Sequence, residues 1–147
     1  MTFAEEIENE IKEFINKIGN IHYHSDSNYG VEYLNNNFRF LGTKIDLSKE
    51  KNYVSYDFKK NNFLDMMTFF EFEDIKEKIL ESNEIHYVGD GITNSELVFS
   101  GKEFFKLLEF LFVNIPEHHY FFDMEKKWCL LIATEGWIDY GEKSIEI

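Results

Sequence analysis

The sequence is poor in several residue types that would assign it to a class of protein. It has a single cysteine, Cys129, so an intramolecular disulfide is excluded. Its single arginine is Arg39, and most of its lysines are interleaved with acids, so it lacks the basic patch that nucleic-acid binding requires. It has one proline and no low-complexity tract, internal repeat or linker. These absences favour one domain, residues 1–147, without direct contact with nucleic acid.

Long apolar runs are missing too. No stretch approaches the roughly 20 apolar residues of a membrane span. The first residues, 1–6, are acidic almost at once, whereas a signal peptide is basic and then apolar. With the low cysteine content, this predicts a cytoplasmic protein that does not bind a membrane.

Acidic and aromatic residues, in contrast, are abundant. The chain has 28 Asp plus Glu against 15 Lys plus Arg, a formal net charge of -13. Aromatic residues make up 18% of it, including 16 Phe, which indicates a folded globule because disordered chains lack large apolar groups. The charge favours a basic partner, although the alternative is that it serves solubility alone.

Three helices are expected. Thr2 and Glu5 form a capping-box pattern, an apolar stripe at spacings of three and four follows, and Gly19 ends this first helix. Ser100 and Glu103 start another helix in the same way, with a stripe that extends to residue 112. Segment 62–82 is ambiguous, and helical propensity in 74–81 favours a helix there.

The remaining segments resemble strands. Short aromatic and β-branched runs occur at 21–23, 31–34, 38–41 and 53–58, with a turn at 35–37, and predict an antiparallel meander. Further strands are expected at 86–88, 96–99, 119–122, 128–133 and 137–140, with a turn at 134–136. The predicted fold is α+β, an antiparallel β-sheet with helices packed on one face.

Catalytic chemistry has little support in the sequence. His22 and His24 lie on the same side of a predicted strand, but no third metal ligand is set by their spacing. Carboxylates are so numerous that two of them could lie close together by chance, so a pair is no evidence of acid–base catalysis. The sequence also has no nucleophile motif. We therefore expect a protein that is not an enzyme and has no cofactor. A small metal-dependent hydrolase using His22, His24 and a carboxylate remains an alternative.

Partner binding is the better-supported hypothesis. Acids cluster among aromatic residues, a combination that suits protein interfaces. The candidate contact residues are Glu71, Glu73, Asp74, Glu77, Asp90, Glu135 and Asp139. The neighbouring aromatic residues are Phe70, Phe72, Tyr87, Trp137 and Tyr140, and the alternative is that they belong to the core while the acids form a soluble rim.

The C-terminal third resembles a known group of proteins. Residues 118–123 (HHYFFD) and 128–141 (WCLLIATEGWIDYG) are similar to a hairpin near the C-terminus of small immunity proteins from bacterial polymorphic-toxin and contact-dependent growth inhibition systems. This resemblance implies a cytoplasmic protein that binds one cognate toxin domain and blocks its active site. An acidic member suits a basic nuclease toxin. An adaptor domain with a different protein partner is the remaining alternative.

Overall fold

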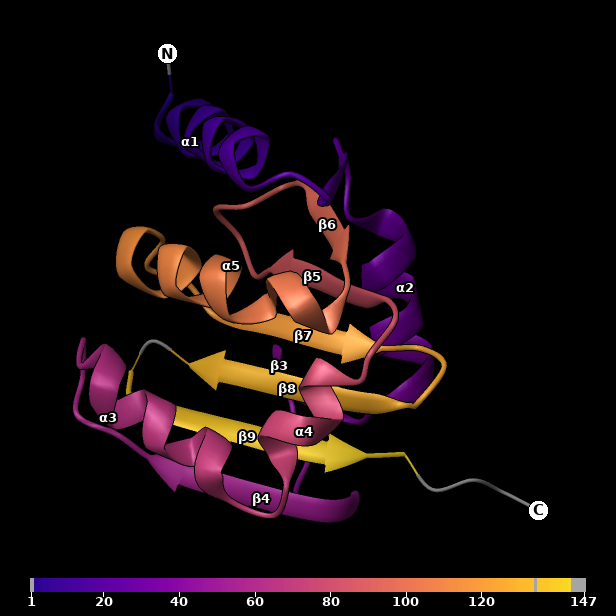
Figure 1. The fold of residues 1–147 in the computed structure, drawn as a ribbon. Coiled ribbons are helices and arrows are strands. Elements are labelled where there is room, and N and C mark those ends of the chain that lie inside the picture. Colours follow the sequence, from indigo (N-terminus) through magenta and orange to yellow (C-terminus); the bar gives the residue numbers. More distant parts are fainter. Residues whose placement is uncertain (1, 134, 144–147) are drawn as a thin grey trace.

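The computed structural model describes residues 2–133 and 135–143. It contains a seven-stranded antiparallel sheet with the order β1-β6-β5-β7-β8-β9-β4, and a two-stranded ribbon, β2-β3 (Figure 1). The strands are β1 (His22–His24), β2 (Phe40–Leu41), β3 (Lys44–Ile45), β4 (Lys51–Asp57), β5 (Ile85–Gly89), β6 (Glu96–Phe99), β7 (His119–Asp123), β8 (Trp128–Ala133) and β9 (Trp137–Glu142). The helices are α1 (Phe3–Ile18), α2 (Asn28–Asn37), α3 (Phe63–Met67), the 3-10 helix η1 (Thr68–Glu71), α4 (Ile75–Leu80) and α5 (Gly101–Asn114). The predicted α+β class is confirmed.

The interior of the sheet comes from the C-terminal half of the chain. β7 and β8 are buried along their whole length, and antiparallel pairing joins β5 to β6, β7 to β8, and β8 to β9. Near-continuous apolar runs of this kind are typical of strands covered on both faces. The strands predicted in this half are confirmed, although the turn expected at 134–136 includes Thr134, which lies outside the described residues.

The N-terminal half supplies the two edges of the sheet. The strands predicted at 21–23 and 53–58 are confirmed as β1 and β4, but β1 pairs with β6 and β4 pairs with β9, so the antiparallel meander predicted over 21–58 is wrong. The strand expected at 31–34 and the turn expected at 35–37 both belong to α2. Gly30, Leu34 and Phe38 explain this helix, because they recur every fourth residue and are all buried. The Glu96 carboxylate accepts the Gly30 N–H at 2.8 Å, which satisfies a donor at the helix start from across the fold.

Alternation along the strands divides the core between the two faces of the sheet. In β8, Trp128, Leu130 and Ile132 join the larger cluster, which contains residues of α1, α3, α4 and α5. Cys129 and Leu131 point the other way, into a smaller cluster with residues of α2. Figure 1 shows α3, α4 and α5 in front of the sheet and α2 behind it. Helices therefore cover both faces, because the residues assigned to a strand form α2 on the second face.

Segment 62–82 forms three short helices where one was expected. α3, η1 and α4 follow one another, with a break at Glu73 and Asp74, whose φ angles are 51° and 58°. Phe69 and Phe70 are both buried and Phe72 packs against the same cluster. Two consecutive residues in the left-handed region cannot belong to a right-handed α-helix, so the chain changes direction at Glu73 and Asp74 before α4 begins.

The helix ends agree with the sequence at α1 and differ at α5. At α1, the Glu5 N–H donates to Thr2 Oγ1 at 3.1 Å in the predicted capping box, and Gly19 ends the helix with a φ of 77°. At α5 the helix starts after Ser100 as expected, but the Ser100 side chain caps nothing. A Cβ atom on Gly101 would lie 2.0 Å from the Ile79 carbonyl oxygen, so glycine is required where α5 meets α4.

Candidate interaction surface

The acidic residues predicted to bind a partner fall into three places. Glu71, Glu73, Asp74 and Glu77 lie on or between η1 and α4, Asp90 and Glu135 lie in the loops after β5 and β8, and Asp139 lies on β9. All are exposed except Asp139, which is half-buried. The structure therefore separates residues that the sequence grouped together, and their surroundings differ in charge.

Asp90 and Glu135 are held together by a histidine, and we call this group the His118 cluster. His118 Nδ1 lies 3.0 Å from Asp90 Oδ2, and Nε2 lies 2.5 Å from Glu135 Oε2. Lys44 Nζ is 3.7 Å from Glu135 Oε1 and 4.6 Å from the centre of the Trp137 ring. The hydrogen bond from His118 holds the pKa of Glu135 below its usual value. These carboxylates therefore already have partners within the protein.

The acids of η1 and α4 differ in this respect. We call Glu71, Glu73, Asp74 and Glu77 the helical acids. Within the described part of the chain, none of them forms an ion pair with a lysine, arginine or histidine. Their charges are exposed to solvent and none of them is held in an ion pair, so they are available to a basic partner.

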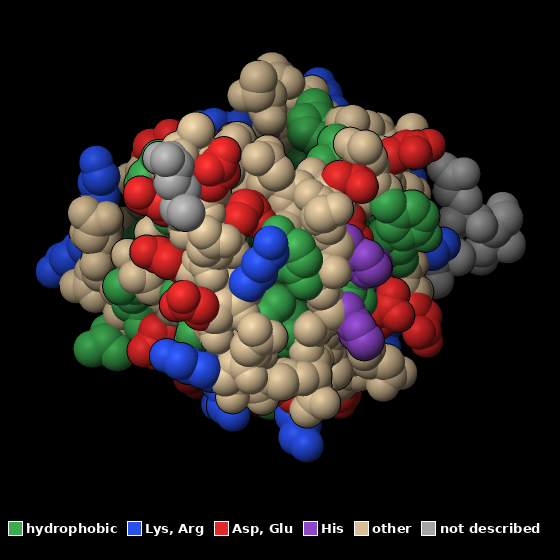
Figure 2. Space-filling view, turned by 90° about the horizontal axis from the view of Figure 1, so that it is seen from above, with side chains coloured by type: hydrophobic (Ala, Val, Ile, Leu, Met, Phe, Trp, Pro, Cys, Tyr) green, Lys and Arg blue, Asp and Glu red, His purple; other side chains and the backbone are tan. Residues whose placement is uncertain are grey.

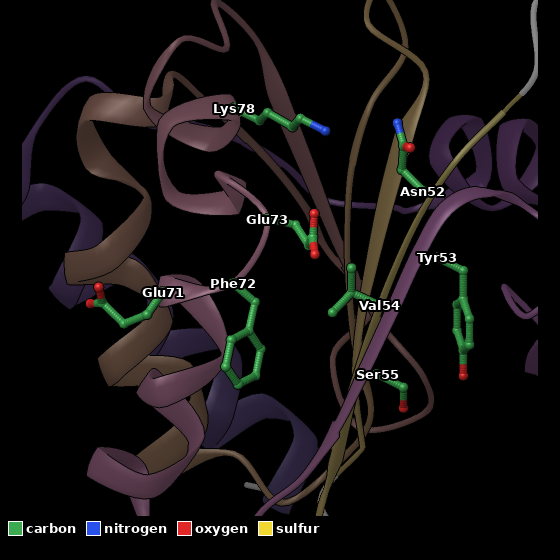
Figure 3. Close-up of a pocket in the computed structure, with 8 residues that line it drawn as sticks. All are labelled: Asn52, Tyr53, Val54, Ser55, Glu71, Phe72, Glu73 and Lys78. Atoms are coloured by element: carbon green, nitrogen blue, oxygen red, sulfur yellow. The ribbon is translucent and has the colours of Figure 1, made fainter.

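A groove runs between the helical acids and the edge strand β4, and we call it the edge groove. Its volume is about 680 Å³ and its lining includes Asn52–Ser55 on one side and Glu71, Phe72, Glu73 and Lys78 on the other. Figure 3 shows Phe72, Glu73 and Val54 directed into the space between β4 and the helices. Tyr53 and Ser55 extend from the opposite side of the strand (Figure 3). The groove thus combines an aromatic wall with an acidic one.

The two ends of the edge groove are fixed by hydrogen bonds and ring packing. At one end, Glu142 accepts from Lys78 Nζ at 2.8 Å and from Asn52 Nδ2 at 2.7 Å. Burial would raise the pKa of Glu142, but these hydrogen bonds outweigh it and keep the pKa below its usual value. At the other end, the Tyr56 and Phe72 rings pack edge to face, with their centres 5.6 Å apart. Lys78 is the cation of the groove lining, and its charge is compensated by Glu142.

Asp139 lies next to β4 on the second face of the sheet. It accepts a hydrogen bond from Ser55 Oγ at 2.5 Å, across the pairing of β4 with β9. Burial raises the pKa of Asp139, and repulsion from Asp57 and Asp46 adds to the effect, against the hydrogen bond from Ser55. Asp139, Asp57 and Asp46 therefore lie close enough on this side of the edge strand to repel one another.

The histidines considered for a metal site border a different pocket, of about 450 Å³. His22 and His24 are exposed on β1, and Figure 2 shows histidine side chains beside acidic and hydrophobic ones on the upper face of the molecule. His86 lies deeper, with Nδ1 2.8 Å from Glu96 Oε2 and Nε2 2.8 Å from Glu84 Oε1. Among the described residues, no three His, Cys, Asp or Glu side chains converge as a metal site would require.

The aromatic residues considered for the interface divide between core and surface. Phe70, Tyr87 and Tyr140 are buried in the larger cluster, in agreement with the alternative interpretation. Phe72 and Trp137 are half-buried and lie beside charged groups, Phe72 in the edge groove and Trp137 under Lys44. Only these two are placed to contact a partner.

Sequence reasoning missed the residues that define the geometry of this surface. It assigned no role in partner binding to Asn52, Val54 or Lys78, which line the groove, or to His118 between the acids. Lys78 and Glu142 are 64 positions apart, and only the pairing of β4 with β9 and the packing of α4 bring them together. No local pattern in the sequence signals such contacts.

Searches of protein-family models, curated proteins and solved structures found no match to this chain. Among the helices of the described residues, none has the length and apolar character needed to cross a membrane.

Proposed function

We propose that this protein is an immunity protein that binds and neutralises a cognate toxin domain, a basic nuclease, in the cytoplasm. It acts by stoichiometric occlusion, covering the active site of the toxin with an acidic surface. The proposal combines the resemblance of the C-terminal hairpin to immunity proteins with the charge distribution described above. A nuclease groove must attract phosphate, so its positive potential would also attract this protein.

The observation that carries the proposal is the lack of ion pairs at the helical acids beside an open groove. Lys76 and Lys78 flank Glu77 in the sequence, but among the described residues neither forms an ion pair with a helical acid, and Lys78 is held by Glu142. Glu71 and Glu73 line a concave site beside this pair. Uncompensated charge at a concave site accelerates association with an oppositely charged partner, to about 10⁸–10⁹ M⁻¹s⁻¹ at low salt in favourable cases.

Co-expression tests the proposal. The protein is produced together with a candidate toxin domain, taken from the C-terminus of a large secreted protein encoded next to it, where one is found, and growth is compared with that domain alone. Rescue of growth and a one-to-one complex on gel filtration are expected. A toxic domain that is neither bound nor neutralised would contradict immunity. Binding of a non-toxic protein would favour the adaptor alternative, and metal-dependent hydrolysis by the purified protein would favour the hydrolase.

A further inference from the structure

The two edge strands of the sheet are not equally protected from pairing with another chain. Unpaired backbone groups on an edge are a template for a further strand, and short strands, bulges and lysines reduce this tendency. β1 has three residues, whereas β4 has seven. In β4 the register shifts between Lys51 and Val54, where Asn52 has a φ of 55°, and it is regular from Val54 to Asp57. The regular stretch is therefore the accessible part of this edge.

The ladder shows which backbone groups of β4 face outward. The Phe58 N–H donates to the Gly136 carbonyl at 2.9 Å, directly after the strand. Hydrogen-bonded and non-hydrogen-bonded pairs alternate in an antiparallel ladder, so Val54 and Tyr56 bond to β9. The N–H and C=O groups of Ser55 and Asp57 then point away from β9, along the edge that borders the groove.

From this arrangement we infer that the edge groove binds an extended, basic segment of the partner protein as an eighth strand beside β4. This mode of recognition takes affinity from backbone hydrogen bonds and specificity from alternate side chains. The outward groups of Ser55 and Asp57 supply the backbone bonds. The identity of the partner as a toxin domain rests on the proposed function, but the chemistry of the segment does not.

The charge around β4 determines what kind of segment fits. Successive side chains of an added strand would point alternately to the two faces of the sheet. One face presents Phe72 and Glu73, and the other presents Tyr53, with Asp57 and Asp139 nearby. Each side thus offers an aromatic ring and a carboxylate, a combination that suits lysine or arginine. A segment with basic residues at successive positions is accommodated on both sides.

A second copy of this chain is a poor occupant of the same edge. Pairing two β4 strands would bring Asp57 and Glu73 of one copy close to the same acids of the other, in a protein whose net charge is -13. Like charges opposite one another on paired strands are destabilising. The structure therefore favours a basic partner over a homodimer.

One substitution separates the backbone contribution from that of the side chain. Ser55→Pro removes the outward N–H, and proline is tolerated on an edge strand when its nitrogen faces away from the ladder. Ser55→Ala is the matched control, because it removes only the side-chain bond to Asp139. Thermal unfolding of both variants establishes that the fold is retained before binding is compared.

The experiment measures binding of two probes to the wild type and both variants. The first probe is the toxin domain, and the second is a short peptide that repeats Lys-Lys-Thr-Thr, so that lysines point to both faces, with the same peptide carrying glutamate in place of lysine as its control. With either basic probe, the amides of Ser55 and Asp57 should exchange more slowly with solvent in the wild type. Ser55→Pro should weaken binding at least about ten-fold relative to Ser55→Ala.

The two probes separate failure of this inference from failure of the proposed function. Equal binding of the toxin domain to both variants, without protection of these amides, would overturn strand addition and leave immunity intact. Binding of the lysine peptide at β4, without binding of the toxin domain, would support strand addition and contradict the assigned partner. No binding of either probe at β4, or protection of these amides by self-association alone, would overturn the inference.

Discussion

The helical acids and the His118 cluster consist of the same residue types in opposite electrostatic situations. Asp90 and Glu135 both contact His118, and Glu135 Oε1 also lies 3.7 Å from Lys44 Nζ. Among the described residues, Glu71, Glu73, Asp74 and Glu77 have no such cation. An acidic side chain in this protein is therefore an interaction candidate only where the fold leaves its charge uncompensated.

The largest expected effect comes from reversing the unpaired charges. We expect Glu71→Lys, Glu73→Lys and Glu77→Lys together to slow association with the proposed toxin partner by about 100-fold at low salt, because steering is lost. Asp74 is left unchanged because it is the N-cap residue of α4 and has a φ of 58°. Stopped-flow association kinetics provide the measurement.

A matched triple variant controls for net charge. Glu10→Lys, Glu13→Lys and Glu32→Lys change the total charge equally, at exposed positions of α1 and α2. Their association rate should stay within a few-fold of the wild type. Equal slowing by both triple variants would mean that overall charge, and not the helical acids, directs binding.

Breaking the His118 cluster should affect stability and not binding. His118→Ala leaves Asp90 and Glu135 without their shared hydrogen-bond partner, and we expect the free energy of unfolding to fall by about 1–2 kcal/mol. Urea denaturation measures this change. A folded His118→Ala protein with strongly weakened toxin binding would show that the cluster belongs to the interface.

Neutralising the crowded acid beside β4 should have a smaller effect of opposite sign. Asp139→Asn keeps an acceptor for Ser55 Oγ but removes the repulsion from Asp57 and Asp46. The unfolding free energy at neutral pH should rise by about 0.5 kcal/mol. Asp57→Asn is the companion variant and should change stability in the same direction. A loss of stability in both would contradict the account of crowding.

The pH dependence of stability distinguishes the His118 cluster from Asp139, the crowded acid beside β4. The pKa of Glu135 is lowered, so its contribution to stability is present above its unfolded pKa and is lost as pH falls through its folded value. The pKa of Asp139 is raised, so the folded state disfavours its ionised form and stability falls as pH rises through that window. Carboxyl titration by NMR should show Glu135 below and Asp139 above their usual values. Shifts in the same direction would be inconsistent with this contrast.

Helices and strands that are determined by residues close in the sequence could be predicted, whereas those that depend on distant residues could not. Local signals suffice for α1, where Thr2, Glu5 and Gly19 mark both ends, and for β8, whose apolar run from Trp128 suits a strand covered on both faces. α2 has three asparagines at its end and is secured by Glu96, 66 positions from Gly30. Nothing near Gly30 in the sequence reveals that contact.

The candidate site shows the same limit. The sequence identified acidic residues that are mostly exposed, but not which of them are paired, because His118 reaches both Asp90 and Glu135 only once the sheet has formed. The edge groove depends on the break at Glu73 and on the position of β4 at the end of the sheet. Both features are consequences of tertiary packing.

The most direct test of the central claim is the rate of association with the proposed toxin partner, measured as a function of ionic strength. Uncompensated charge at the helical acids predicts a rate that falls at least about ten-fold between low and high salt in the wild type, and a much weaker dependence in the Glu71, Glu73 and Glu77 triple reversal. A wild-type rate that does not change with salt, or an unchanged dependence in that variant, would contradict the account.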